Sequence, residues 1–262
     1  MITLKENEFR LIQKIVYESS GIALGHNKKK MVEARLLRRL RKHNLESFAH
    51  YIRLVQIEPA EKNEMINQIT TNETYFFREM PHFDFLQHHV IPRFGHDTIR
   101  VWSAAASVGA EAYSIAMLME ASGKEYEVVG TDINSDVIEK AKIGLYPEKW
   151  TKHIPQRYLK MFCLKGKGDY AGQFLVDRSL TKRVRFLQSN LLERNGSLGM
   201  FQVIFLRNVL LYFDAPTKER VIENVLSNLV LGGYFIISLT ENLNDVHVQG
   251  LRQVQTSVFE KV

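Results

Sequence analysis

The stretch Thr98-Ile99-Arg100-Val101-Trp102-Ser103-Ala104-Ala105-Ala106-Ser107-Val108-Gly109 decides the fold of this chain. Its first half is rich in β-branched and aromatic residues and predicts a strand over 98–103. Its second half is a run of small residues that leads into a predicted helix over 110–121. Small side chains let a backbone approach a ligand closely, and the first amides of a helix are free donors. This stretch therefore predicts an α/β unit with a ligand site at the strand end.

The alternation of strands and helices continues toward the C-terminus. Helices are expected from Ser135, the predicted N-cap, through Lys142 and over roughly 217–229. Further strands are expected over 127–132, 184–188, 203–206 and 234–238. Such alternation implies a mostly parallel sheet that is covered on both faces. Residues 144–183 interrupt the pattern with several glycines, which predicts a small β insertion.

Residues 1–70 predict a small helical bundle. Leu4, Phe9, Ile12 and Ile15 recur at helical spacing, and Ser19-Ser20-Gly21 ends that pattern. A second helix over 28–43 has one apolar stripe, and further short helices are expected over 46–54 and 60–69.

The face opposite the apolar stripe of the second helix is basic. Such a patch favours an acidic partner, although a solvated helix face is the simpler alternative. Nucleic acid, anionic lipid and an acidic protein surface all fit the charge. The candidate docking residues are Lys28, Lys29, Lys30, Arg35, Arg38, Arg39, Arg41 and Lys42.

The bulk properties of the chain limit its class. Its 262 residues are 45% hydrophobic, which suffices for one large core or two smaller ones. No apolar run approaches the roughly 18 residues of a membrane span, and the start has no secretory pattern. A single cysteine, Cys163, excludes an internal disulfide and a Cys-rich metal site. We expect a cytoplasmic protein with no metal site, and nothing suggests an obligate oligomer.

The predicted second strand ends in Asp132. This carboxylate follows Gly109 at about the 20-residue offset at which an acidic residue accepts hydrogen bonds from ribose hydroxyls. The alternative is that Asp132 caps the next turn together with Asn134. The full GxGxxG spacing is missing, which disfavours a dinucleotide site and an NAD-dependent dehydrogenase.

Two later strand ends carry further candidate ligand-binding side chains. The amide of Asn190 can pair with the edge of adenine, and Leu191 can cover the flat face of the base. After the strand over 203–206 come Arg207, Asn208 and Tyr212. In an open parallel sheet these positions share the edge at which ligands bind. Turn formation by Asn190 and core packing by Tyr212 are the alternatives.

A polar and aromatic segment, Thr71-Asn72-Glu73-Thr74-Tyr75-Phe76-Phe77-Arg78-Glu79, precedes the first strand. Aromatic rings beside an arginine and an asparagine suggest a ligand pocket, because buried polar groups need partners. A loop that the three aromatic side chains pack onto a domain is the alternative.

These segments, in this order, resemble the CheR-type chemoreceptor glutamate methyltransferases, which use S-adenosylmethionine. The resemblance implies a Rossmann-like class I methyltransferase sheet with an N-terminal all-helical domain and a small β insertion. It implies a receptor-docking domain over 1–75, a methyltransferase domain over 76–262 and an insertion within 144–183, which tethers receptors in some members. The best-matched pieces are Thr71–Glu79, Val101–Ser107, Tyr113-Ser114-Ile115-Ala116, Thr131-Asp132-Ile133, Asn190–Glu193 and Arg207–Asp214.

The resemblance also implies roles for single residues. Arg78 and Tyr212 would lie near the transferred methyl group and the substrate carboxylate, and the basic helix would meet acidic receptor helices. Together with Tyr212, Phe76 and Phe77 suit an aromatic, partly dry site. The implied product is a γ-glutamyl methyl ester, used in chemotaxis adaptation. Residues implied to bind the cofactor are Asn72, Thr74, Arg78, Glu111, Asp132, Asn190, Leu191, Arg207 and Asn208.

The chain departs from the family pattern at four places, namely Ala110, Gln202, Leu206 and Leu239. Ala110 replaces one of two acidic residues, so Glu111 is the remaining acidic candidate for the cofactor. These departures permit a non-catalytic, cofactor-binding relative that acts as a signalling scaffold. A pI of about 9.3 permits an RNA methyltransferase. The basic segment contains no aromatic residue for base stacking, so nucleic acid is not the expected partner.

Overall fold

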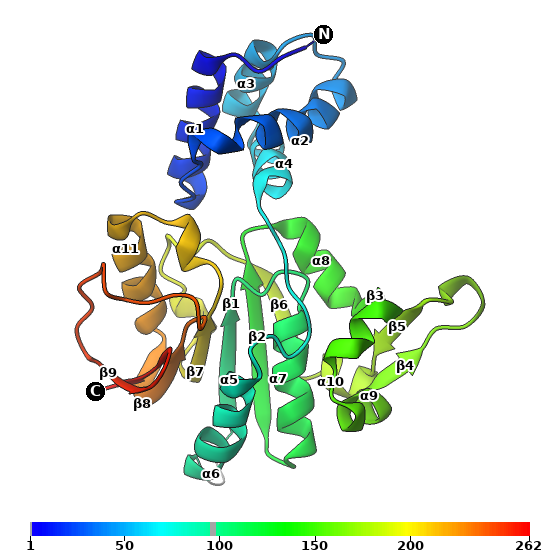
Figure 1. The fold of residues 1–262 in the computed structure, drawn as a ribbon, viewed down its shortest axis with the longest axis vertical. Helices are drawn as coiled ribbons and strands as arrows, with labels where there is room; N and C mark the ends of the chain where they lie inside the picture. The colour runs from blue at the N-terminus through cyan, green and yellow to red at the C-terminus, as the bar shows by residue number, and fades with distance from the viewer. Residues whose placement is uncertain (1, 95–97) are drawn as a thin grey trace.

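The computed structural model describes residues 2–94 and 98–262 and shows a helical domain above a larger domain built on a β-sheet (Figure 1). An extended linker leaves the last helix of the first domain and runs into the second. Apolar side chains such as Phe9, Leu36 and Tyr51 form a separate core in the helical domain. The helices of this domain are α1 (Glu6–Ser20), α2 (Lys29–Lys42), α3 (Phe48–Ile57) and α4 (Pro59–Ile69).

The larger domain alternates strands and helices as expected. Its helices are α5 (Met80–Phe85), α6 (Ile91–Arg93), α7 (Ala110–Ala121), α8 (Ser135–Ile143), α9 (Gln156–Phe162), α10 (Arg178–Thr181) and α11 (Ala215–Leu226). The strands of its main sheet are β1 (Ile99–Ala104), β2 (Tyr126–Asp132), β6 (Val184–Gln188), β7 (Phe201–Leu206), β8 (Leu229–Ile236), β9 (Leu251–Gln255) and β10 (Val258–Lys261).

Within the described residues the main sheet has seven strands in the order β6-β2-β1-β7-β8-β10-β9. The first five are parallel, and β10 is antiparallel to both of its neighbours. The chain runs outward from β1 to β6 and then returns to β7 on the other side of β1. The carboxyl ends of β1 and β7 therefore form the switch point at which open α/β sheets bind ligands. This arrangement confirms the expected mostly parallel sheet.

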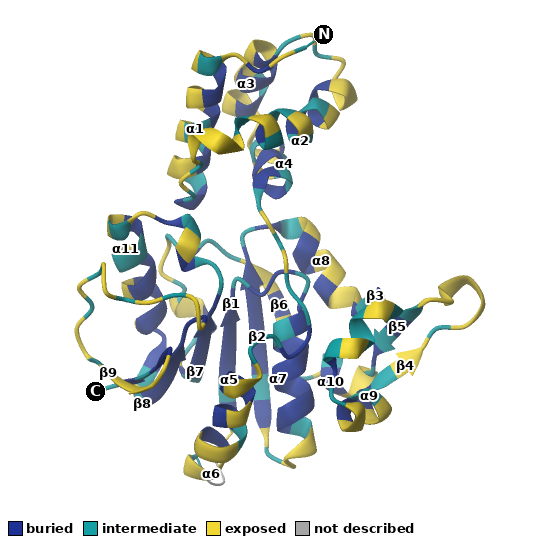
Figure 2. Ribbon diagram, in the orientation of Figure 1, coloured by how far each residue is buried: buried dark blue, intermediate teal, exposed yellow. Residues whose placement is uncertain are grey.

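Both faces of the sheet are covered. Val101 and Trp102, neighbours in β1, point to opposite faces and belong to two different apolar cores. Helix α7 packs on the first face and is buried almost all round, while α11 packs Val221 and Val225 on the second. Figure 2 shows the buried strands between these helices.

The hairpin of β9 and β10 was not predicted from the sequence. Strand β9 has the sequence Leu-Arg-Gln-Val-Gln, and four of its five residues are exposed at the sheet edge. Without a buried face, the strand has no clear apolar alternation from which to recognise it.

The predicted insertion is present as a three-stranded antiparallel sheet in the order β3-β5-β4. Its aromatic side chains pack on the linker, with the Phe76 ring centroid 5.0 Å from that of Tyr146 and 5.6 Å from that of Phe174. The insertion therefore fixes one side of the linker that leads to the strand ends. The strands are β3 (Leu145–Pro147), β4 (Cys163–Lys165) and β5 (Gln173–Val176).

Polar contacts fasten the helical domain to the sheet domain on two sides. On one side, Asn67 of α4 donates to the Ser135 hydroxyl at 2.9 Å and accepts from the Asn134 amide at 3.0 Å. On the other, the Tyr17 hydroxyl of α1 donates to Asp214 at 2.9 Å. Asn134, whose side chain accepts from the first amides of α8, is the N-cap, so the prediction of Ser135 as the cap was wrong by one residue.

The prediction that Arg39 docks a partner was wrong. Its side chain is buried and donates to Glu61 at 2.8 Å and to Glu64 at 2.7 Å, so it holds α2 onto α4 and is not available to a partner. Arg35 is also engaged, since it donates to three carbonyls at the C-terminal end of α4. Lys29 pairs with Glu6 at 3.0 Å. The exposed members of the predicted patch are Lys28, Lys30, Arg38, Arg41 and Lys42.

We expect Glu61→Gln to destabilise the helical domain by about 2 kcal/mol at pH 7, because Arg39 loses its main buried partner. Burial raises the pKa of Glu61, but hydrogen bonds from Arg39, Tyr51 and His43 outweigh burial and hold the pKa at about 2. This depressed pKa stabilises the fold above about pH 4.5, and the contribution is lost as the pH falls toward 2. The difference between wild type and variant should therefore shrink with falling pH.

Thermal unfolding at pH 7, 4 and 3, followed by circular dichroism, measures this difference. Glu46→Gln, at an exposed position of the same domain, is the matched control and should behave as wild type. A difference that stays constant from pH 7 to pH 3 would contradict the assigned role of the Glu61 carboxylate.

Candidate functional site

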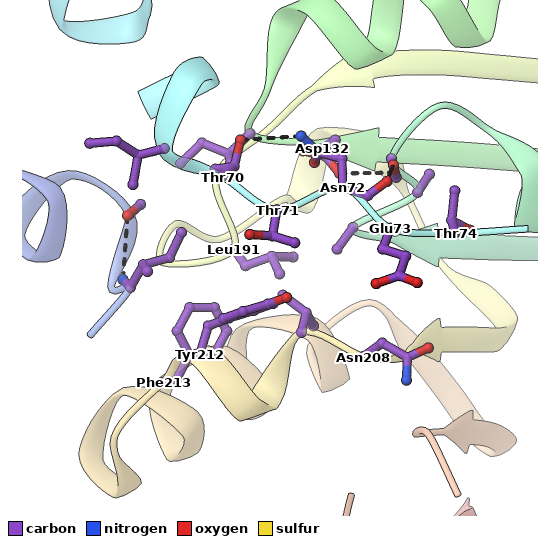
Figure 3. A pocket seen from close by; sticks show the side chains of 18 of the residues that line it. Thr70, Thr71, Asn72, Glu73, Thr74, Asp132, Leu191, Asn208, Tyr212 and Phe213 are labelled. Atoms are coloured by element: carbon purple, nitrogen blue, oxygen red, sulfur yellow. Dashed lines mark hydrogen bonds between the residues drawn. The ribbon is translucent and has the colours of Figure 1, made fainter. Parts of the chain in front are cut away.

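A cavity lies at the carboxyl edge of the sheet, beneath the helical domain (Figure 3). It is bounded by the loop between α1 and α2, the linker after α4, and the loops after β1, β2, β6 and β7. Every residue predicted to bind cofactor or to act in catalysis lines it, while their individual roles remain predictions. These residues are Asn72, Thr74, Arg78, Glu111, Asp132, Asn190, Leu191, Arg207, Asn208 and Tyr212.

Asp132 at the end of β2 both organises the loops and faces the cavity. Its carboxylate accepts from the Ser107 amide and from the Asn134 amide, each at 2.9 Å. Burial raises the pKa of Asp132, and these backbone donors partly oppose the rise. A carboxylate has about four acceptor positions, and the backbone amides of Ser107, Ile133 and Asn134 do not use all of them, so acceptor capacity remains for a hydroxyl donor of a ligand. The turn-capping alternative thus describes part of the geometry and leaves room for ribose binding.

The backbone around the cavity is strained. Among the described residues, seven non-glycine residues have a left-handed φ, and five of them lie in the linker or in the strand-end loops at this site. Such conformations cost about 1–3 kcal/mol each and concentrate at functional sites. The five are Phe77, Glu79, Ala105, Ser107 and Asn208.

A buried arginine lies between two carboxylates at one end of the cavity. Arg207, directly after β7, donates to Glu111 at 2.7 Å and lies 3.1 Å from Glu79, with its side chain 1% exposed. Glu111 also accepts from the Ser103 hydroxyl at 2.6 Å. Arg207 offsets one of the two negative charges, and hydrogen-bond donors such as the Ser103 hydroxyl and the Leu239 amide help to satisfy the carboxylate oxygens. Glu79 was not among the predicted site residues, although it ends the quoted linker motif.

The two residues predicted to act in catalysis are less restrained. Arg78 donates to the Glu73 carbonyl at 3.1 Å and lies 5.7 Å from the ring centre of Tyr75. Most of its five guanidinium N–H donors stay available to a ligand. Tyr212 lies in the turn after β7, and Figure 3 shows its ring across the cavity from Thr71.

The predicted aromatic lining is only partly correct. Phe76 and Phe77 do not line the cavity, because both are buried in the apolar core below it. Phe76 packs on the insertion, and Phe77 stacks on Tyr158 with ring centroids 5.1 Å apart. Tyr212 is the member of this aromatic group that does line the cavity.

The loop between α1 and α2 also lines the cavity, and sequence reasoning missed it. Ile22, Ala23 and Leu24 contribute, and the Ala23 amide donates to the Tyr212 carbonyl at 2.8 Å. The Asn190 side chain donates to the Ser19 carbonyl at 2.8 Å, so part of its amide already holds α1 in place. Nothing local to this loop signals a contact with residues almost 200 positions away.

Comparison with known sequences identifies the family. The family described as CheR methyltransferase, SAM binding domain, matches residues 72–259, and the one described as CheR methyltransferase, all-alpha domain, matches residues 7–70. The chain belongs to the CheR methyltransferase family. The larger domain of this CheR chain is therefore a methyltransferase domain that binds S-adenosylmethionine.

Curated relatives agree along most of their length. Chemotaxis protein methyltransferase 2 of Pseudomonas aeruginosa is 39% identical over 96% of this chain and 92% of its own. Chemotaxis protein methyltransferase of Escherichia coli is 37% identical over 93% of this chain and 87% of its own. That of Borreliella burgdorferi is 34% identical over 92% of this chain and 90% of its own. In the described part of the present chain, no helix is long and apolar enough to cross a membrane.

The four departures from the CheR pattern lie outside the residues that line the cavity. Ala110 and Leu206 are completely buried in the two sheet cores. The Gln202 side chain accepts from the Arg100 amide near the starts of β1 and β7, away from the ligand edge. Leu239 is partly exposed and uses its amide to bind Glu79 at 2.9 Å. The cavity of this chain is therefore lined by other residues than the four departures.

The cavity suits a nucleoside that carries a charged amino-acid tail. Asp132 offers remaining acceptor capacity for hydroxyl groups, and Leu191 and Ile133 offer apolar surface for a flat ring. At the other end Glu111 can accept from an ammonium group, and Arg78 can donate to a carboxylate. The side-chain Nε of Arg207 is buried there and has no hydrogen-bond partner among the described residues, so this end also has an unused donor.

Proposed function

We propose that this chain transfers the methyl group of S-adenosylmethionine to glutamate side chains on the cytoplasmic helices of chemoreceptors. The observation that supports this proposal most directly is that all ten predicted residues line one cavity. Arg78 is among them, and its guanidinium keeps donors available beyond its hydrogen bond to the Glu73 carbonyl. The names of the curated relatives as chemotaxis protein methyltransferases support the receptor as substrate.

When bound, the cofactor supplies a methyl group on a positively charged sulfur. The acceptor is a glutamate carboxylate, whose pKa of about 4.3 leaves it ionised near neutral pH, so no general base is required. A carbon–sulfur bond breaks and a carbon–oxygen bond forms, giving a thioether and a γ-glutamyl methyl ester. The protein must therefore orient oxygen, carbon and sulfur in a line, which supplies up to about 7–11 kcal/mol.

The residues divide this task between them. Arg78 directs the substrate carboxylate by a charge-assisted hydrogen bond, and Tyr212 provides an aromatic wall that limits water. Because the opposite charges of nucleophile and sulfonium neutralise each other in the transition state, a partly dry wall favours the reaction over the separated ions. Asp132, Asn190 and Leu191 hold the nucleoside at the other end.

Substrate docking falls to the exposed basic residues of the helical domain. Lys28, Lys30, Arg38, Arg41 and Lys42 form a positive surface that suits acidic receptor helices. Lys28 also lines the cavity, so the basic surface reaches the reaction site. The chain acts as a monomer in this proposal.

Incubation with a methyl-labelled donor and an acidic helical receptor fragment tests the function. We expect base-labile label on the fragment, which identifies a methyl ester, and none on a fragment whose acceptor glutamates are changed to glutamine. Label on RNA, with tight and salt-sensitive RNA binding, would instead indicate an RNA methyltransferase. Cofactor binding without any transfer would indicate a scaffold.

A further inference from the structure

Glu79 binds several groups of the site without lining the cavity. It ends the linker in a left-handed conformation with φ 62°, and its side chain turns away from solvent. One carboxylate oxygen accepts from the Leu239 amide at 2.9 Å and the other from the Ser238 hydroxyl at 2.7 Å. The carboxylate also lies 3.1 Å from the Arg207 guanidinium. Glu79 therefore joins the linker to the ends of β7 and β8.

Ser238 extends this connection to Asn208. The Ser238 hydroxyl, which is completely buried, accepts from the Asn208 side chain at 2.7 Å while it donates to Glu79. Asn208 itself has a left-handed backbone, with φ 58°, and its backbone N–H donates to Glu241 at 3.0 Å. The Ser238 hydroxyl thus fixes the orientation of the side-chain amide of Asn208, a residue that lines the cavity.

The Glu79 carboxylate is connected to Arg78 through the guanidinium of Arg207. One Arg207 nitrogen is shared between the Glu79 carboxylate and the carbonyl of Arg78. Arg207 is therefore held from two sides, by Glu111 in the cavity wall and by Glu79 behind it. Without the rear carboxylate, Arg207 would have Glu111 as its remaining ionic partner, and its bond to the Arg78 backbone would no longer be fixed.

We propose that Glu79 and Ser238 are positioning residues, which place Arg78, Arg207 and Asn208 at the methyl-transfer end of the cavity without touching cofactor or substrate. This inference rests on the proposed function. Burial raises the pKa of Glu79, but the Leu239 amide, Arg207 and Ser238 outweigh burial and hold the pKa at about 2, so the carboxylate stays ionised at every working pH. A displacement of about 1 Å at such residues can lower a rate by roughly 100-fold.

The inference predicts which kinetic constant changes. Arg78, Arg207 and Asn208 are also implied to bind the cofactor, but in this proposal Asp132 and Leu191 hold the nucleoside at the far end, so cofactor affinity should change much less than kcat. For Glu79→Gln we expect kcat to fall about 30-fold while the Kd for S-adenosylhomocysteine changes less than about threefold. For Ser238→Ala, which removes one link, we expect kcat to fall about fivefold. The double variant should resemble Glu79→Gln, because both residues act in one chain of contacts.

The experiment measures initial rates on the receptor fragment, with active sites counted by calorimetric titration with S-adenosylhomocysteine. Glu139→Gln, at an exposed position on α8, is the matched control and should keep the wild-type rate. Counting the sites that bind S-adenosylhomocysteine distinguishes a folded variant with a misplaced site from a variant that does not fold. If Glu79→Gln does not fold, Ser238→Ala tests the same inference.

Equal kcat per active site in the wild type and in the folded variants would overturn the positioning role of Glu79 and Ser238, and it would leave the proposed function standing. A loss of cofactor affinity as large as the loss of kcat would also overturn it, because it would place Glu79 in cofactor binding. Absence of transfer by the wild-type protein would overturn the proposed function and the inference with it.

Discussion

Arg78→Ala is expected to lower the rate of methyl transfer about 100-fold, the size of effect that a misplacement of a reacting group by about 1 Å can have. The carbonyl of Arg78 accepts from Arg207, and the Arg78 guanidinium makes one hydrogen bond within the described residues, to the Glu73 carbonyl. The side chain is therefore anchored at its base and has donors to spare at its tip. Removing this side chain should impair the orientation of the acceptor carboxylate and should change the stability of the fold little.

Initial rates at saturating receptor fragment, together with calorimetric titration of S-adenosylhomocysteine, measure this effect. Arg78→Lys should recover part of the rate, since lysine keeps the charge but loses the planar pair of donors. Arg10→Ala, an exposed position on α1, is the control for loss of a positive charge. A wild-type rate in Arg78→Ala would remove this residue from the catalytic machinery.

Asp132→Ala is expected to weaken cofactor binding about 100-fold, because two hydrogen bonds to an ionised group contribute about 1.5 kcal/mol each. The structure adds a second effect, since the variant leaves the amides of Ser107 and Asn134 without their acceptor. Both loops line the cavity or support it. The rate at saturating cofactor should fall much less than the affinity, because Asp132 lies away from the transferred group.

Calorimetry with S-adenosylhomocysteine gives the affinity, and circular dichroism confirms that the variant is folded. Asp136→Ala, an exposed carboxylate on α8, controls for the change in charge. Unaltered affinity in Asp132→Ala would refute the role of this carboxylate in holding the ribose.

The elements that carry strong local signals were predictable from the sequence. The predicted strand over 184–188 coincides with β6. It was recognisable because a short apolar segment is bounded directly by polar turn residues. The residues at the strand ends were also predictable as a group, since parallel topology brings carboxyl ends to one edge.

Features that depend on distant contacts were not predictable. Arg39 looks like its exposed neighbours in α2, and only its pairing with Glu61, 22 positions away, explains its burial. Glu79 meets Ser238 across 159 positions, so no local pattern shows that its carboxylate supports the site. The loop between α1 and α2 belongs to the cavity for the same reason. Periodicity shows which face of an element is buried, and it does not show which partner covers that face.

The wall contributed by Ile22, Ala23 and Leu24 has a thermodynamic consequence. A nucleoside that fills the cavity touches the bundle and the sheet at once, so its binding energy also strengthens their attachment. Linkage is reciprocal, and a receptor that draws the bundle away must loosen the nucleoside by the same factor.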